Sequence, residues 1–142
     1  MSKTDDAYQI VWLVRRLFRA LAHRSTDSLQ DLGISAADRA VLEFLYPNEK
    51  LSVPEIAERY QVSRQHVQTT VNVLVNGKFV GKEVNPRHRR SPLLSLTARG
   101  RTLFKKIKVR DKDTIDYLFS SIPEKDRRVT HRTLEALLEK LR

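Results

Sequence analysis

One short stretch of this chain is rich in side chains that can hydrogen bond to the edges of nucleic-acid bases. Arginine can donate two parallel hydrogen bonds to guanine, and glutamine can both donate to and accept from adenine. Val67, Val71 and Leu74 recur in the stretch at three- and four-residue spacing, which is typical of a helix with one buried face. The polar side chains that this helix would expose are Ser63, Arg64, Gln65, His66, Gln68, Thr69 and Asn72.

A shorter helix is expected just before this one, because Ser52 and Glu55 have the spacing of a capping box. In that arrangement the serine hydroxyl and the glutamate carboxylate satisfy the free amide groups at a helix start. The break at residues 60–62 separates the two helices, and Ser63 offers the second N-cap. Gly77 is expected to end the second helix in a left-handed conformation. Two helices joined by a short turn form a helix-turn-helix.

Two short apolar runs follow, Phe79 to Val84 and Leu93 to Leu96, and they predict a β-hairpin. Leu51 is expected to pair with this hairpin as a small third strand. A hairpin with a basic tip beside a helix-turn-helix is a wing, whose cations would contact phosphates or enter the adjacent minor groove. The residues expected to contact DNA from the wing, its base and the helix after it are Lys78, Lys82, Arg87, His88, Arg89, Arg90 and Arg99.

With the wing included, the chain resembles the MarR family of bacterial winged-helix regulators. The matching pieces are Leu74–Val80, the Asn85-Pro86 wing with its arginines, and Leu94–Gly100, which is similar to the family's Leu-Thr-x-x-Gly junction. The family usually has an aspartate just before the wing arginines, where this chain has His88. The resemblance covers nearly the whole chain. It implies a homodimeric regulator that binds a palindromic operator in double-stranded DNA, most often as a repressor.

These patterns predict a mainly α-helical protein with a small β-hairpin wing, an α+β arrangement in a single domain of 142 residues. Residues 32–101 would form the winged helix-turn-helix, and residues 1–31 and 102–142 would supply dimerisation helices. The terminal helices carry apolar stripes, which either pack on each other in a monomer or on a second copy; we favour the homodimer. The expected interface residues are Ile10, Val14, Leu17, Phe18, Leu134, Leu137, Leu138 and Leu141.

The remaining helix boundaries follow from capping residues and polar breaks. The first helix is expected over residues 7–22, with residues 1–6 frayed and residues 23–31 in a loop or a weak turn of helix. Three further N-caps are expected: Ser35 in a capping box with Asp38, Thr97 before a long helix, and Ser121 in a capping box with Glu124.

The net charge of +10 is concentrated in one segment. From Lys78 to Arg110 there are eleven Lys or Arg residues and a single acid, Glu83, so this segment alone carries +10. The rest of the chain has 16 basic and 16 acidic residues. Concentrated positive charge favours binding to a phosphate backbone through the release of counterions. A solvated surface that only aids solubility would not need this confinement.

Other functional classes receive little support from the sequence. The four histidines have no metal-ligand spacing, and the four glycines form no phosphate-binding loop, so we expect no metal, no cofactor and no enzyme. The resemblance also suggests a cleft for a small aromatic or anionic ligand that releases DNA, although ordinary core or surface positions would explain the same residues. Residues that could contribute to such a cleft are Trp12, Arg15, Arg16, Phe18, His23 and Tyr46.

The absence of cysteine excludes disulfides and thiolate metal sites and favours a reducing compartment. No apolar run approaches the ~20 residues of a membrane span, and the N-terminus is polar. We therefore expect a bacterial or archaeal cytoplasmic protein that associates with the nucleoid and not with a membrane. The alternative function is an architectural DNA-binding protein, or an adaptor for nucleic acid or protein, without ligand control.

Overall fold

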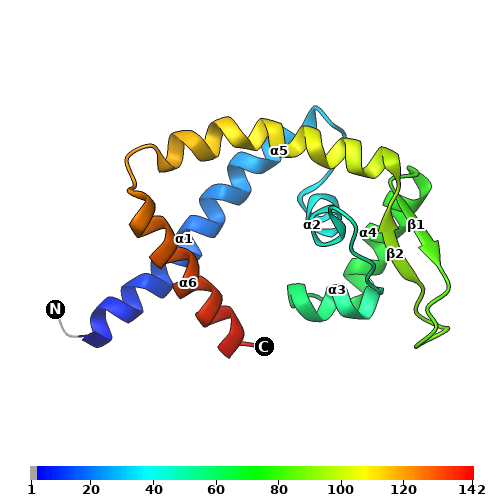
Figure 1. Cartoon of the computed structure of the whole chain (residues 1–142), viewed down its shortest axis with the longest axis horizontal. Helices are drawn as coiled ribbons and strands as arrows, with labels where there is room; N and C mark the ends of the chain where they lie inside the picture. The colour runs from blue at the N-terminus through cyan, green and yellow to red at the C-terminus, as the bar shows by residue number, and fades with distance from the viewer. Residues whose placement is uncertain (1–2) are drawn as a thin grey trace.

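The computed structural model describes residues 3–142, and the side chains of all of these except residues 3–4 and 25–28. The winged helix-turn-helix forms one lobe, α1 and α6 form the other, and α5 runs along both (Figure 1). This mainly helical fold with one small hairpin is the predicted fold class. The elements follow in the order α1 (Lys3–Gln30), α2 (Ala36–Leu45), α3 (Val53–Tyr60), α4 (Arg64–Asn76), β1 (Val80–Glu83), β2 (Leu93–Leu96), α5 (Ala98–Phe119) and α6 (Glu124–Lys140).

Capping side chains begin four of these helices where the sequence predicts, and one of them is Ser63, which caps α4. Ser35 and Ser52 form complete capping boxes, in which each hydroxyl accepts from an amide three residues on and the carboxylate there accepts from the serine's own amide. Thr97 caps α5, because its Oγ1 accepts from the Gly100 amide at 3.1 Å. These caps fix the starts of α2, α3, α4 and α5 from local sequence alone.

The capping box predicted from Ser121 is not formed. Instead, α6 begins at Glu124 with Pro123 at the N-cap position, and no side chain caps it. A proline disfavours the helical conformation of the residue before it, so Ile122 cannot serve as the first helical residue after a Ser121 cap. The start of α6 is therefore displaced toward the C-terminus.

The first helix is longer than the sequence predicts. The prediction has residues 1–6 frayed and residues 23–31 in a loop or a weak turn of helix. Instead, α1 is one continuous helix from Lys3 to Gln30, and residues 1–2 lie outside the described part of the chain. Leu29 accounts for the extension, because its side chain is only 1% exposed and belongs to the core. Burial of one apolar residue beyond a polar stretch keeps that stretch helical, against its local preference.

The end of α4 also differs from the prediction. Gly77 has a φ of −78°, and the left-handed residue is Lys78, with a φ of +62°. A Cβ on Gly77 would lie 2.8 Å from two ring carbons of Phe79. Glycine is therefore needed at this position for space and not for a positive φ.

The hydrophobic core lies within the winged-helix lobe and is closed on one side by α5. The hairpin pairs Val80 with Leu96 and Glu83 with Leu93. Leu51, predicted as a small third strand, pairs with the hairpin only through an isolated bridge to Leu94. One face of α5 enters the core through Leu103, Phe104 and Ile107. Residues at or below 2% exposure from the other elements are Leu29, Leu42, Leu45, Ile56, Val67, Val71, Leu74, Val80 and Leu94.

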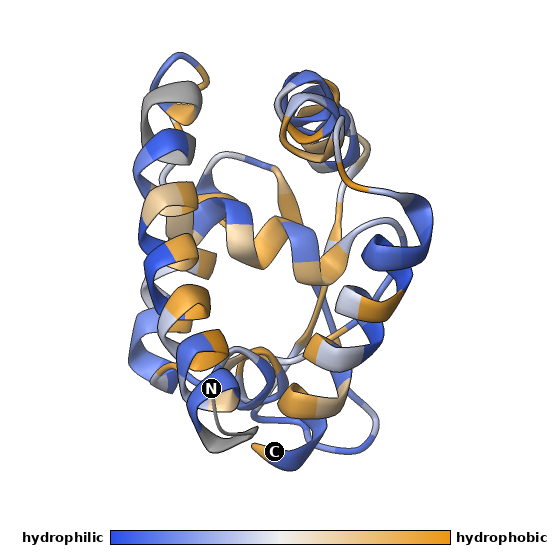
Figure 2. Cartoon of the chain, turned by 90° about the vertical axis from the view of Figure 1, so that its left-hand side faces the viewer, coloured by the Kyte–Doolittle hydropathy of each residue, from blue (hydrophilic) through white to orange (hydrophobic). Residues whose placement is uncertain are grey.

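The apolar stripes of α1 and α6 remain uncovered within one chain. None of the residues of α6 is buried, and Leu17 and Phe18 of α1 are 56% and 63% exposed. Figure 2 shows α1 and α6 apart, on opposite sides of the view, with apolar residues along α1. The two stripes therefore do not cover each other, as the monomer alternative would require.

Gly100 is expected to be indispensable for folding. A Cβ at this position would lie 2.1 Å from the carbonyl oxygen of Phe79 in the backbone, so Gly100→Ala must push α5 away from β1. We expect the free energy of unfolding in urea to fall by about 3 kcal/mol. Gly81→Ala is the matched control, because its Cβ would meet only Thr97 Cγ2 at 3.9 Å. Equal unfolding midpoints for the two variants would contradict this assignment.

Candidate nucleic-acid interface

The polar face of α4 is exposed, as the helical spacing predicts. Val67, Val71 and Leu74 are at most 2% exposed and anchor the helix to the core. Gln68 is half-buried beside this apolar face. The side chains that the helix presents to solvent at its N-cap and along its outer face are Ser63, Arg64, Gln65, His66, Thr69 and Asn72.

Hydrogen bonds along α4 orient its two glutamines. Gln68 Nε2 donates to Asn72 Oδ1 at 2.9 Å, and Gln65 Nε2 lies 3.5 Å from Thr69 Oγ1. Each pair spans one helical turn, so the amide groups lie along the helix surface and not straight out into solvent. Ser63 differs from the others, because its Oγ already accepts from the His66 amide at 3.0 Å.

Asn85 holds the wing in shape from inside the loop. Its side chain is 6% exposed, its Nδ2 donates to the Ser91 carbonyl at 3.0 Å, and its Oδ1 accepts from the Arg87 amide at 3.1 Å. Two successive turns complete the loop, closed by amide-to-carbonyl bonds from His88 to Asn85 and from Ser91 to His88. The sequence alone does not predict this role of Asn85, although an asparagine followed by proline is a known turn signal.

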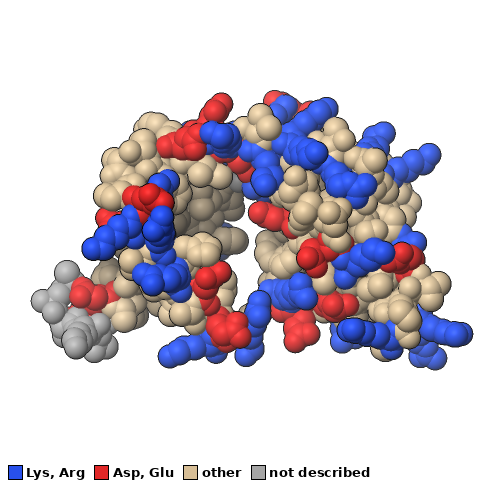
Figure 3. Space-filling model, in the orientation of Figure 1, with Lys and Arg blue, Asp and Glu red and all other residues tan. Residues whose placement is uncertain are grey.

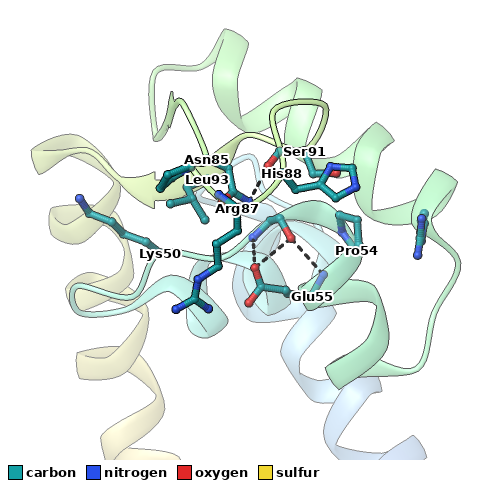
Figure 4. Close-up of a pocket in the computed structure, with 11 residues that line it drawn as sticks. Lys50, Pro54, Glu55, Asn85, Arg87, His88, Ser91 and Leu93 are labelled. Carbon is teal, nitrogen blue, oxygen red and sulfur yellow. Dashed lines mark hydrogen bonds between the residues drawn. The ribbon is translucent and has the colours of Figure 1, made fainter.

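The wing residues that the sequence predicts to contact DNA lie in two different places. Arg87 and His88 line a pocket of about 650 Å³ between the wing and the start of α3, together with Lys50, Glu55 and Arg64 (Figure 4). Glu55 is the acid of this set, and its carboxylate is already engaged by Ser52 in the capping box. The pocket therefore carries an excess of positive charge and suits a phosphate group. Lys50 is a residue that the sequence analysis missed.

Arg89 and Arg90 lie elsewhere, in the second turn of the wing. Both are exposed and neither lines the pocket. This separates the wing residues predicted to contact DNA into a pair near the recognition helix, Arg87 and His88, and a pair at the tip. Arginines at a wing tip can reach the minor groove, where narrow tracts concentrate negative potential.

The remaining predicted phosphate contacts are spread around the base of the wing. Lys78 and Lys82 are exposed, Lys78 at the end of α4 and Lys82 on β1. Arg99 lies over the Phe79 ring, 4.7 Å from its centroid. Lys50 Nζ, which the sequence did not single out, forms an ion pair with Glu83 of β1 at 2.8 Å.

The residues suggested for a ligand cleft are only partly brought together. Trp12, Arg15 and Arg16 line one groove on α1 with Phe18. Tyr46 instead packs against Phe104 of α5, with ring centroids 4.9 Å apart, and is not among the residues that line this groove. His23 is exposed and does not line it either. A cleft formed by all of these residues remains a prediction.

A hydrogen bond joins the two lobes close to the start of α4. Gln61, the left-handed residue that ends α3 at a φ of +57°, donates from its Nε2 to the Leu141 carbonyl at 3.1 Å. The end of α6 therefore touches the turn between α3 and α4. Nothing in the sequence signals this contact, because the two residues are 80 positions apart.

Among the side chains that the structure describes, no group of three His, Asp or Glu residues is arranged to hold a metal ion. None of the described helices is long and apolar enough to cross a membrane.

Comparison with known proteins identifies the family of the winged helix-turn-helix. The model of the MarR family matches residues 32–91, which include α2, the helix-turn-helix and the wing up to Ser91. The winged helix-turn-helix of this chain belongs to the MarR family. Members of this family are DNA-binding transcription regulators and not enzymes, in agreement with the exposed polar face of α4 and the basic wing.

Two solved structures show that the MarR fold extends over nearly the whole chain. The transcriptional regulator BldR from Sulfolobus solfataricus is 19% identical, with a TM-score of 0.85 over 99% of each chain. The MepR–DNA complex of Staphylococcus aureus is 20% identical, with a TM-score of 0.76 over 92% of this chain and 96% of that one. Among curated relatives, the uncharacterized protein Rv2011c of Mycobacterium tuberculosis is 36% identical over 104 residues. That segment is 72% of this chain and 66% of that protein.

Replacing Asn85 should loosen the wing of this MarR-family chain without unfolding the core. In Asn85→Ala the Ser91 carbonyl and the Arg87 amide lose their partner, which costs about 1–3 kcal/mol of local stability. We expect faster amide hydrogen exchange from Arg87 to Ser91 and severalfold weaker binding to duplex DNA. Asn85→Asp is the control, because it retains the acceptor for the Arg87 amide. Unchanged exchange in the alanine variant would show that the wing does not depend on Asn85.

Proposed function

We propose that this protein is a homodimeric regulator that binds a palindromic operator in double-stranded DNA and represses transcription in a bacterial or archaeal cytoplasm. The observation that carries the proposal is the combination of an exposed polar face on α4 with a basic wing beside it. The helix would read base edges in the major groove, and the wing tip would lie in or over the adjacent minor groove.

The residues can be sorted by what they would contact. Arg64, at the start of α4, would fork to guanine, and Gln65 and Gln68 have the donor and acceptor that adenine presents. Ser63, His66, Thr69 and Asn72 would contact bases or phosphates around them. The pocket lined by Lys50, Arg87 and His88 would hold a backbone phosphate, and Lys78, Lys82 and Arg99 would fix the orientation of the protein through further phosphates. The similarity of the fold to the MepR–DNA complex supports this division.

The uncovered apolar stripes support the homodimer. Side chains on α1 and α6 that the sequence analysis placed in the interface are between 39% and 71% exposed in one chain. A contiguous apolar face of this kind is normally buried by a partner. A two-fold pair of reading heads would fit half-sites one or more helical turns apart, each turn about 34 Å.

Release of the DNA by a small aromatic or anionic ligand completes the proposal. The groove on α1 that Trp12, Arg15, Arg16 and Phe18 line offers apolar surface next to positive charge, which suits such a molecule. Binding there would change DNA affinity only if the ligand prefers one arrangement of the two reading heads.

Single substitutions should separate base reading from phosphate contact. Arg64→Ala should cost roughly 1–3 kcal/mol of binding free energy on the preferred operator and relax the preference at one base pair. Lys82→Ala should weaken binding to all duplexes about equally, because it removes a phosphate contact. The measurement is affinity at fixed salt for an operator recovered from genomic fragments and for its single-base variants. Equal losses across all variants for both substitutions would contradict the assignment and favour an architectural role.

The dimer can be tested through a charge placed in the proposed interface. Sedimentation at micromolar concentration should show a dimer for the wild-type chain and a monomer for Leu17→Glu, because a carboxylate buried between apolar helices is unpaired. Val109→Glu is the control, since Val109 is 69% exposed on α5, outside the proposed interface. A wild-type monomer, or a dimer that survives Leu17→Glu with unchanged affinity, would refute this interface.

A further inference from the structure

The fold divides the basic segment of the sequence into two separate surfaces. Eleven cations lie between Lys78 and Arg110, and the proposed function uses mainly those at the wing and its base. The others belong to α5, and apart from Arg99, which was assigned a phosphate contact, they are not explained by the recognition of an operator. The wing group is Lys78, Lys82, Arg87, Arg89 and Arg90, and the α5 group is Arg99, Arg101, Lys105, Lys106, Lys108 and Arg110.

The outer face of α5 points away from the reading face. The buried face of α5 packs on α2 and β2, and α2 in turn packs on α4. Figure 1 shows α5 along the upper edge of the molecule, α3 and the wing tip along its lower edge, and α2 between them. A straight duplex that lies on α4 and the wing therefore cannot also lie along the outer face of α5.

The outer face of α5 carries a dense group of cations, which we call the α5 cationic patch: Arg101, Lys105, Lys106 and Lys108. Arg101, Lys105 and Lys108 recur at i, i+4 and i+7, so they share one flank of the helix, and Lys106 lies on the other flank. No acidic residue occurs between Ala98 and Arg110. Figure 3 shows Lys and Arg gathered over this part of α5 and Asp and Glu over its other end.

The charge of this patch is not neutralised by neighbouring acids. Lys105 and Lys106 are exposed and have no hydrogen bond or ion pair with any described residue. Lys108 is also exposed, and its Nζ lies 5.1 Å from the centroid of the Tyr46 ring. The arginine of the patch, Arg101, is half-buried and donates from Nη1 to the Leu96 carbonyl, so the three lysines supply most of the accessible charge.

Two of the three acids that follow the patch along α5 already have partners. Asp111 forms an ion pair with Arg39 of α2. Asp116 accepts a hydrogen bond from Lys112 Nζ at 2.6 Å, and this bond raises the pKa of Lys112 above its ordinary value. Neither of these two acids is paired with a cation of the patch, which therefore keeps its positive charge.

Duplex DNA fits this patch better than a protein does. Protein interfaces are depleted in lysine at their centre and anchored by aromatic side chains. Between Ala98 and Arg110, Val109 is an exposed large apolar residue, but no aromatic side chain is exposed that could serve as an anchor. Lysine acts as a mobile point charge, which suits contacts to phosphates without regard to sequence. The helix rises about 10 Å from Arg101 to Lys108, a length over which a duplex presents several phosphates.

We propose that the α5 cationic patch is a second DNA-binding surface, independent of sequence, that holds a second segment of duplex while α4 and the wing hold the first. Each chain would then bind DNA on two sides, and the protein could bring two segments together. This goes beyond the proposed function, because recognition of one operator does not need the patch.

The test uses a random-sequence duplex of about two helical turns, so it does not require a known operator. A reading-head variant combines Arg64→Ala, Gln68→Ala, Arg89→Ala and Arg90→Ala, and a patch variant combines Lys105→Gln, Lys106→Gln and Lys108→Gln. Fluorescence anisotropy at ~0.05 M and ~0.15 M salt gives the affinity and its salt dependence. Because the patch lysines are exposed, circular dichroism should show an unchanged fold.

We expect the reading-head variant to retain binding to the random duplex. Adding the patch substitutions should weaken this binding at least about tenfold and lower the salt slope by about one for each lysine removed. The matched control replaces the same three lysines by arginine, which keeps the charge and should keep the binding. In a bead assay, the wild-type chain should carry a labelled second duplex to an immobilised one, and the patch variant should bind only the immobilised duplex.

Three outcomes would overturn the proposal. The first is no loss of affinity on adding the patch substitutions to the reading-head variant. The second is equal recovery of the second duplex by the wild-type chain and the patch variant. The third is protection of Lys105 and Lys106 from acetylation by poly-glutamate but not by duplex, which would assign the patch to an acidic protein. Failure of the proposed function has a different signature, since a chain without operator preference would still bind the random duplex through α5.

Discussion

The arrangement of the DNA-facing elements depends on one close backbone junction, at the start of α5. Thr97 Oγ1 donates to the Lys78 carbonyl at 2.7 Å, the Thr97 amide donates to the Phe79 carbonyl, and Gly100 passes so near the same Phe79 carbonyl that a Cβ would not fit. The end of α4, the start of β1, the end of β2 and the start of α5 all meet there. The recognition helix and the wing are therefore fixed to each other by main-chain contacts. These contacts explain the threonine and the glycine of the Leu-Thr-x-x-Gly motif.

Local chemistry accounts for the parts of the fold that the sequence predicts well. Serine or threonine at an N-cap with the right partner three residues on places the starts of α2, α3 and α5, and apolar spacing identifies the buried face of α4. Where the prediction is wrong, a non-local contact or a steric constraint decides. The core position of Leu29 keeps α1 helical beyond its polar stretch, the Phe79 ring leaves no room for a Cβ on Gly77, and Pro123 displaces the start of α6.

The candidate site follows the same division. The polar side chains of α4 and the cations of the wing can be identified from residue type and spacing, because both signals are local. The role of Asn85 as an internal brace could not be predicted, since it depends on the carbonyl of Ser91 across the loop. The separation of Arg87 from Arg89 likewise depends on how two successive turns are folded. The basic segment reads as one feature in the sequence and becomes two only when α2 is placed between α4 and α5.

The hydrogen bond between Gln61 and the Leu141 carbonyl connects two parts of the protein that are proposed to bind different partners, namely DNA and a second subunit. It ties the last turn of α6 to the turn that starts the recognition helix. If α6 takes part in self-association, as proposed, then any shift of α6 on dissociation must either break this hydrogen bond or move the reading head. Subunit association would then change the free energy of duplex binding, and duplex binding would change the free energy of association by the same amount. Bound DNA would stabilise the dimer by the same free energy by which dimer formation favours DNA binding.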